Sequence, residues 1–140
     1  MTGAQIKTVV VERDLPFGPE RIWRALTQPH LMAEWLMKTD FVPQIGARFT
    51  LSSDHVTIDC QVRMIEPLRS LSYSWDAHGL QSVVTWTLTP TPTGTLLRME
   101  QVGFRLDQAQ AYGGARQGWA RFFDRLDAVL ALEIQREGEA

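Results

Sequence analysis

Three histidines and one cysteine are the residues of this sequence that most often hold transition metals. His30, His55, His78 and Cys60 stand far apart along the chain. No two of them have the i, i+4 spacing of a helical metal pair or the short spacing of a zinc loop. Each histidine falls at an expected turn or helix start, where polar side chains are usually exposed. The sequence therefore predicts no metal site and no cofactor.

Nucleophilic and acid–base groups form no recognisable catalytic pattern. Cys60 has apolar neighbours in an expected strand, which is typical of a packed thiol, with a reactive thiol as the alternative. Asp59 and Glu100 alternate with inward positions, so we expect both carboxylates to face water. The sequence has no Gly-x-Ser-x-Gly turn of a serine hydrolase. We therefore assign no catalytic residue.

Aromatic side chains are the most unusual feature, with five tryptophans among 140 residues. Apolar and aromatic walls with a few orienting polar groups are typical of ligand pockets, whereas simple core packing is the competing interpretation. The candidate ligand-binding residues are Trp35, Phe49, Leu51, Cys60, Val62, Tyr73, Trp75, Val84, Trp86, Met99, Gln101, Trp119, Phe122 and Phe123. Gln101, Tyr73 and Arg63 would supply the polar groups if they face inward.

Regular elements must position these side chains. β-branched residues predict a first strand over Ile6–Asp14. Pro19 opens a helix that runs to Thr27, and Pro29 separates it from a second short helix over His30–Leu36. Period-two alternation then predicts strands over Arg48–Ser53, Val56–Glu66, Leu71–Asp76, Leu80–Thr89 and Thr95–Gln101.

The C-terminal part predicts one long amphipathic helix of about five turns that ends near Gly138. Its apolar residues at helical spacing are Trp119, Phe122, Phe123, Leu126, Val129, Leu130 and Ile134. Gly103, Gly113 and Gly114 predict a loop before this helix, and we expect that loop to be a mobile gate. The element order predicts an α+β fold, in which a curved antiparallel sheet of about six to seven strands wraps around the long helix. We expect residues 1–140 to form one domain.

Composition narrows the classes of function. The formal net charge is -2, so the chain lacks the broad positive field that nucleic-acid binding needs. No apolar run approaches the roughly 20 residues that span a bilayer, and the first residues lack a signal sequence. A single cysteine suits a reducing compartment. We expect a cytoplasmic protein without membrane insertion or nucleic-acid partner, and a homodimer stays open.

Several segments together resemble a known family. The residues that carry the resemblance are Pro19–Thr27, Pro29–Leu36, Ile45–Phe49, Glu66–Trp75, Gly94–Leu97 and Gly118–Trp119 with Leu126. They are similar to the heat-shock-protein-90 ATPase activator homologue-like group of the START / birch-pollen-allergen-like (SRPBCC) superfamily. The resemblance implies the helix-grip fold with a central cavity. The chain departs from the family pattern at Cys60, where glycine is common, and at Gln101, where many members have histidine.

Three functions remain open at this point. The first is binding of an apolar or amphipathic small molecule in the cavity, without catalysis. The second is a cavity enzyme of the cyclase, hydrolase or dehydratase kind, which the missing inward His, Asp or Glu disfavours. The third is activation of a chaperone ATPase in a stress response, which the family name suggests. A chaperone partner is disfavoured because in that setting this domain is normally the C-terminal half of a larger protein.

Overall fold

The structure, a computed structural model, describes the backbone of residues 6–138 and the side chains of residues 7–133. The elements in chain order are β1 (Ile6–Leu15), α1 (Pro19–Thr27), α2 (Pro29–Trp35), β2 (Lys38–Thr39), β3 (Arg48–Ser52), β4 (Thr57–Glu66), β5 (Ser70–Ala77), β6 (Leu80–Thr91), β7 (Gly94–Arg105), the 3-10 turn η1 (Leu106–Gln108) and α3 (Ala109–Gly138). This order confirms the predicted α+β fold.

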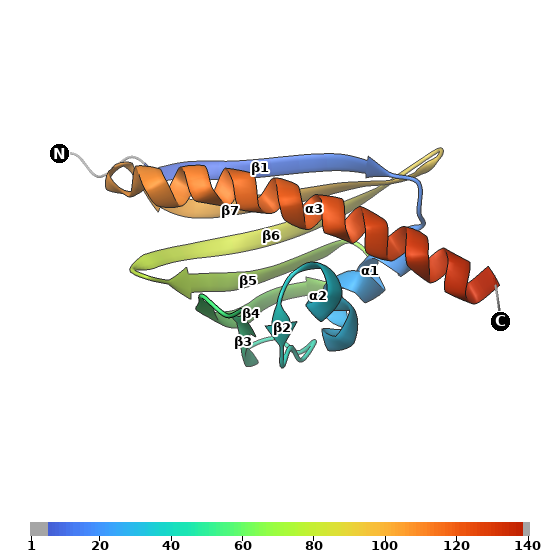
Figure 1. The fold of residues 1–140 in the computed structure, drawn as a ribbon, viewed down its shortest axis with the longest axis horizontal. Coiled ribbons are helices and arrows are strands. Elements are labelled where there is room, and N and C mark those ends of the chain that lie inside the picture. Colours follow the sequence, from blue (N-terminus) through green and yellow to red (C-terminus); the bar gives the residue numbers. More distant parts are fainter. Residues whose placement is uncertain (1–5, 139–140) are drawn as a thin grey trace.

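The seven strands form one antiparallel sheet in the order β1-β7-β6-β5-β4-β3-β2. The first strand therefore pairs with the last, and Ile6 lies opposite Arg105. Figure 1 shows the long helix α3 lying across one face of the curved sheet, with α1 and α2 against the same face. The sheet thus wraps around the C-terminal helix, as predicted.

Alternation along the central strands separates the two faces of the sheet. In β6, Val84, Trp86 and Leu88 are buried, while the residues between them are partly exposed. In α3, Trp119, Phe123, Leu126 and Leu130 are buried at helical spacing. The inner face of the sheet and this stripe of α3 together form most of the core.

The two short helices are fixed to each other by a side-chain hydrogen bond. Each begins with a proline, Pro19 or Pro29, at the first turn, where the missing N–H costs no intrahelical bond. The indole Nε1 of Trp35 donates to the Ala25 carbonyl at 2.8 Å. The same indole packs edge-on against Trp86, with ring centroids 5.6 Å apart. Trp35 therefore joins both helices to the sheet.

The structure corrects the loop predicted before the last helix. Residues 103–105 continue β7, a single 3-10 turn follows, and α3 begins at Ala109, so Gly113 and Gly114 lie inside the helix. The predicted loop was wrong because glycines usually mark breaks, yet these two only lower helix propensity. The two-residue strand β2 was also missed, since so short a segment carries no periodic signal.

Gly103 allows the last strand to continue. Its φ is +134°, and a Cβ built there would lie 2.4 Å from the Gln81 carbonyl oxygen. Across the sheet, the pairing of β1 with β7 slips at this point, between Lys7 and Thr8. Only glycine tolerates this conformation together with so close an approach to the neighbouring strand.

Candidate functional site

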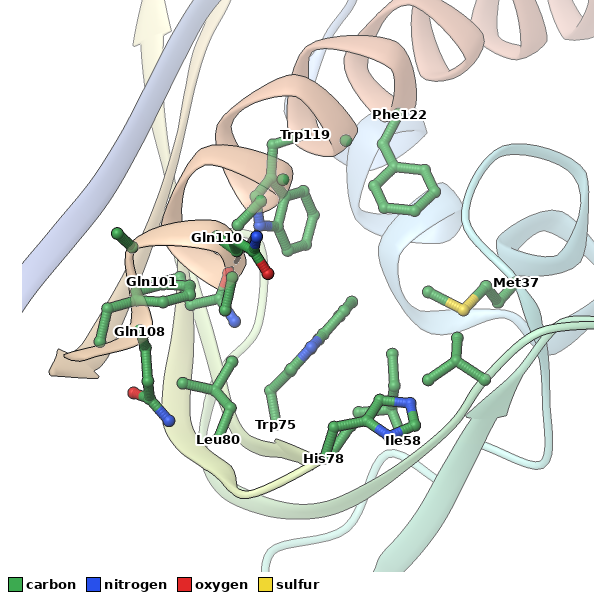
Figure 2. Close-up of a pocket in the computed structure, with 18 of the residues that line it drawn as sticks. Met37, Ile58, Trp75, His78, Leu80, Gln101, Gln108, Gln110, Trp119 and Phe122 are labelled. Atoms are coloured by element: carbon green, nitrogen blue, oxygen red, sulfur yellow. Dashed lines mark hydrogen bonds between the residues drawn. The ribbon is translucent and has the colours of Figure 1, made fainter.

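A pocket of about 700 Å³ opens between the first turns of α3 and the end of the sheet at the β5–β6 turn. We call it the α3 pocket (Figure 2). Strands and the segment after α2 contribute Met37, Val56, Ile58, Trp75, Ala77, His78, Leu80, Gln101 and Phe104, and the η1–α3 segment contributes Asp107, Gln108, Ala109, Gln110, Ala111, Gly114, Ala115, Gly118, Trp119 and Phe122. Small residues on α3 leave this space open.

Aromatic rings form the inner part of the α3 pocket. The rings of Trp75 and Trp119 lie 5.1 Å apart at an interplanar angle of 49°. Phe122 packs against Trp119 at 5.4 Å, with the rings at 71°. Figure 2 shows these three side chains pointing into the space from the sheet and from α3. Flat apolar surfaces of this kind suit a flat apolar molecule.

A hydrogen-bonded relay fixes the polar group at the base of the pocket. The Trp119 indole Nε1 donates to the Gln101 side-chain oxygen at 2.7 Å. The Gln101 amide nitrogen donates to the Ser82 hydroxyl at 2.9 Å, and Ser82 in turn donates to the Trp75 carbonyl at 2.8 Å. All these groups are buried. The relay holds one amide at a defined position in an otherwise apolar region.

A second buried pair lies deeper, outside the α3 pocket. The Trp86 indole donates to the Tyr73 hydroxyl at 3.0 Å. Burial raises the pKa of Tyr73 well above its usual range, and the hydrogen bond from Trp86 only partly offsets this. Tyr73 is therefore a neutral phenol across the physiological range. Trp86 packs against Trp119 and Phe123, so this pair belongs to the core under α3.

The structure places the fourteen candidate residues in two groups. Trp75, Gln101, Trp119 and Phe122 line the α3 pocket. The remaining candidates are buried in the core and do not line it: Trp35, Phe49, Leu51, Cys60, Val62, Tyr73, Val84, Trp86, Met99 and Phe123. Arg63 is exposed and cannot supply an inward polar group, which corrects that expectation.

Several pocket-lining residues were missed by the sequence analysis. Ile58 and Leu80 carry the inward alternation of their strands, which was a usable signal. Phe104 was missed because Gly103 ended the predicted strand too early. The η1–α3 segment was predicted as a mobile loop over one end of the cavity; it does line the pocket, but as a 3-10 turn and the first turns of a helix.

The titratable candidates differ in burial. Cys60 is buried, and burial raises the pKa of its thiol to about 12, with the carboxylates of Asp76 and Asp59 adding to the effect. His78 is exposed at the rim of the α3 pocket. Among the described residues, no three His, Cys, Asp or Glu side chains gather as a metal site would require.

The architecture and the pocket define a helix-grip protein, in which a curved sheet holds a long C-terminal helix and leaves an apolar space at one end of it. The chain belongs to the family described as "Activator of Hsp90 ATPase homolog 1-like protein", whose family model matches residues 16–131. No protein of curated function matches the sequence. Within the described part of the chain, no helix has the length and apolar character that a membrane span requires.

Solved structures share this fold. Protein MLL2253 from Mesorhizobium loti is 57% identical, with a TM-score of 0.87, over 89% of this chain and 97% of that one. DynU16, from the dynemicin biosynthetic locus, is 25% identical, with a TM-score of 0.82 over 89% of this chain and 47% of DynU16. BH1534 from Bacillus halodurans is 22% identical, with a TM-score of 0.81 over 91% of this chain and 99% of that one, which shows the fold alone.

Proposed function

We propose that the protein binds an apolar or amphipathic small molecule in the α3 pocket and carries it without catalysis. The observation behind the proposal is the pocket itself. Its volume of about 700 Å³ falls within the range of about 300–1,000 Å³ typical of small-molecule sites. Its aromatic walls and a few polar groups, among them the buried amide of Gln101, match the composition of such sites.

The arrangement of α3 supports this proposal. Gly114, Ala115 and Gly118 face the pocket, and a Cβ built on either glycine meets no atom within 4 Å. Larger residues at these positions would fill the space and extend the core, so a purely structural role would favour them. The small residues of α3 thus keep the pocket open, although larger residues there would make the protein more stable.

One relative also supports a role with small molecules. DynU16 comes from a biosynthetic locus, and this chain is 25% identical to it over about half of DynU16. A protein of the same fold in a biosynthetic locus suits binding of a metabolite. The identity of that metabolite does not transfer to this chain.

The test uses two adjacent glycines of α3, of which only one lines the pocket. The emission of the neutral dye N-phenyl-1-naphthylamine is followed as it is titrated with the wild-type protein and with two variants. Gly114→Leu places a side chain in the pocket, so we expect saturable binding in the wild type and at least a roughly tenfold weaker affinity in this variant.

Gly113→Leu is the matched control. Gly113 is exposed in the same turn, does not line the pocket, and has open space around its Cβ. We expect this variant to bind the dye as the wild type does. Absence of saturable dye binding in the wild type, or equal affinity in all three proteins, would rule out the α3 pocket as the site.

A further inference from the structure

We infer that the α3 pocket selects a neutral molecule whose hydrogen-bond acceptor, a carbonyl oxygen above all, meets the side-chain amide N–H of Gln101. The inference rests on the proposed function and adds the chemistry of the ligand's polar end. It follows from which groups donate and which accept in the hydrogen bonds among Ser82, Gln101 and Trp119, together with the charge of the pocket walls.

The orientation of the Gln101 amide is fixed by its neighbours. An indole N–H can only donate, so the group that faces Trp119 at 2.7 Å must be the amide oxygen. The Ser82 hydroxyl donates its single proton to the Trp75 carbonyl at 2.8 Å, so Ser82 accepts from the Gln101 nitrogen. Both neighbours agree on the same orientation, and a flipped amide would break both bonds.

This orientation leaves one amide hydrogen to spare. The Gln101 nitrogen carries two hydrogens, and Ser82 takes one of them. None of the described residues accepts the second, although Gln101 is only 1% exposed and lines the pocket. A buried donor without an acceptor is costly, so a ligand oxygen placed there gains a full hydrogen bond.

The charges around the pocket favour a neutral acceptor over a carboxylate. The ionised group that the described wall contributes is the acid Asp107, whose carboxylate pairs with Arg105 at 3.1 Å. No lysine or arginine is among the described lining residues. A carboxylate beside Gln101 would lose its water without meeting a cation, which a neutral carbonyl avoids.

The rings next to Gln101 indicate the part of the molecule beside the acceptor. Trp75 and Trp119 line the pocket together with Gln101, and their ring centroids lie 5.1 Å apart (Figure 2). Flat conjugated groups gain most from contact with indole rings. The class of ligand that fits best is therefore an aromatic or conjugated ketone, ester or amide.

Three probes of similar size test this inference by displacement of N-phenyl-1-naphthylamine. They are 2-acetylnaphthalene, the hydrocarbon 2-isopropylnaphthalene and the anion 2-naphthoate. The hydrocarbon is the more hydrophobic of the first two, so shape and burial alone would favour it. We expect the ketone to bind roughly tenfold more tightly than the hydrocarbon, since one hydrogen bond to a buried donor changes affinity by about that factor. The anion is expected to bind more weakly than the ketone.

A variant then assigns the preference to Gln101. Gln101→Leu removes the donor, so we expect the ketone's advantage to disappear while the hydrocarbon still binds. Gln81→Leu makes the same change at an exposed position outside the pocket and should keep the advantage. In the wild-type protein labelled with 15N, a side-chain amide proton of Gln101 should move downfield with the ketone, as a new hydrogen bond requires, and should not do so with the hydrocarbon. This measurement does not depend on the folding of the variant.

The outcomes separate this inference from the proposed function. If neither the dye nor any probe binds, the proposed function fails and the inference fails with it. If the ketone and the hydrocarbon bind equally well, or if Gln101→Leu keeps the ketone's advantage, ligand binding stands and the inference alone is overturned. Tightest binding of 2-naphthoate would overturn the assignment of a neutral ligand.

Discussion

The Cys60 thiol shows how burial, with nearby carboxylates adding to its effect, can make a cysteine unreactive. Its side chain lies in the core beside Phe49 and Val62 and makes a weak hydrogen bond to the Ile58 carbonyl at 3.8 Å. Burial raises the pKa of the thiol from its ordinary value of 9.0 to about 12. The thiolate, which is the reactive form, is therefore far scarcer near neutral pH than in an exposed cysteine.

We predict that Cys60 is labelled only when the protein unfolds. A disulfide reagent such as 5,5′-dithiobis(2-nitrobenzoate) at pH 8 should react with Cys60 far more slowly in the native protein than in urea. The raised pKa also predicts how stability depends on pH. The thiol of the unfolded chain ionises first, so the contribution of the neutral Cys60 to the free energy of unfolding is complete below about pH 9 and is lost as the pH rises toward 12. Rapid native labelling at pH 8 would contradict the buried, neutral thiol.

At the scale of elements, the first turns of α3 are the least stable part of the helix by composition. Gly113 and Gly114 are exposed, and a Cβ on either meets no atom within 4 Å. We predict that Gly113→Ala and Gly114→Ala each raise the free energy of unfolding by about 0.5–1 kcal/mol, measured by urea denaturation.

Gly103→Ala is the contrasting control for these two alanine variants. There the added Cβ would lie 2.4 Å from the Gln81 carbonyl oxygen at a φ of +134°, so stability should fall. If alanine at 113 and 114 has no effect or destabilises, the segment does not behave as a helix in solution and the predicted mobile gate regains support.

The sequence predicted the elements better than it predicted the pocket. Alternation in β5 and β6 correctly turned Trp75 and Trp86 to the inner face, because strand periodicity reports the face directly. Periodicity says nothing about position along the strand. Trp86 lies in the middle of the sheet beneath α3, whereas Trp75 lies near the β5–β6 turn, where the helix leaves space. That difference depends on how α3 crosses the sheet, which no local pattern contains.

At the scale of the whole molecule, the first strand of the chain is joined to the last strand. β1 pairs with β7 along ten residues, and α3 packs on the inner face of the sheet. Loss of either strand therefore leaves a long unpaired edge in the sheet, and β7 also carries Gln101 and Phe104 of the pocket. We expect unfolding in urea to be one transition, with the same midpoint by circular dichroism and by tryptophan emission.

Ligand binding should then stabilise the entire fold, because the pocket exists only when these elements are assembled. We predict that 2-acetylnaphthalene at one hundred times its dissociation constant raises the free energy of unfolding by about 2.7 kcal/mol. Thermal unfolding of the wild type should shift upward with ligand concentration, and that of Gly114→Leu should shift clearly less at the same concentration, by no more than about half at a tenfold weaker affinity. An equal shift in both proteins would place the binding elsewhere.

Four of the five tryptophans form a continuous chain of neighbours, and this has an optical consequence. The centroid distances are 5.6 Å from Trp35 to Trp86, 5.5 Å from Trp86 to Trp119 and 5.1 Å from Trp119 to Trp75. At such separations the electronic transitions of indoles couple, so excitation absorbed by one ring migrates among all four. The near-ultraviolet circular dichroism of the native protein should therefore show bands from coupled indoles. A quencher that contacts only Trp75 at the pocket should also lower the fluorescence of the other three tryptophans.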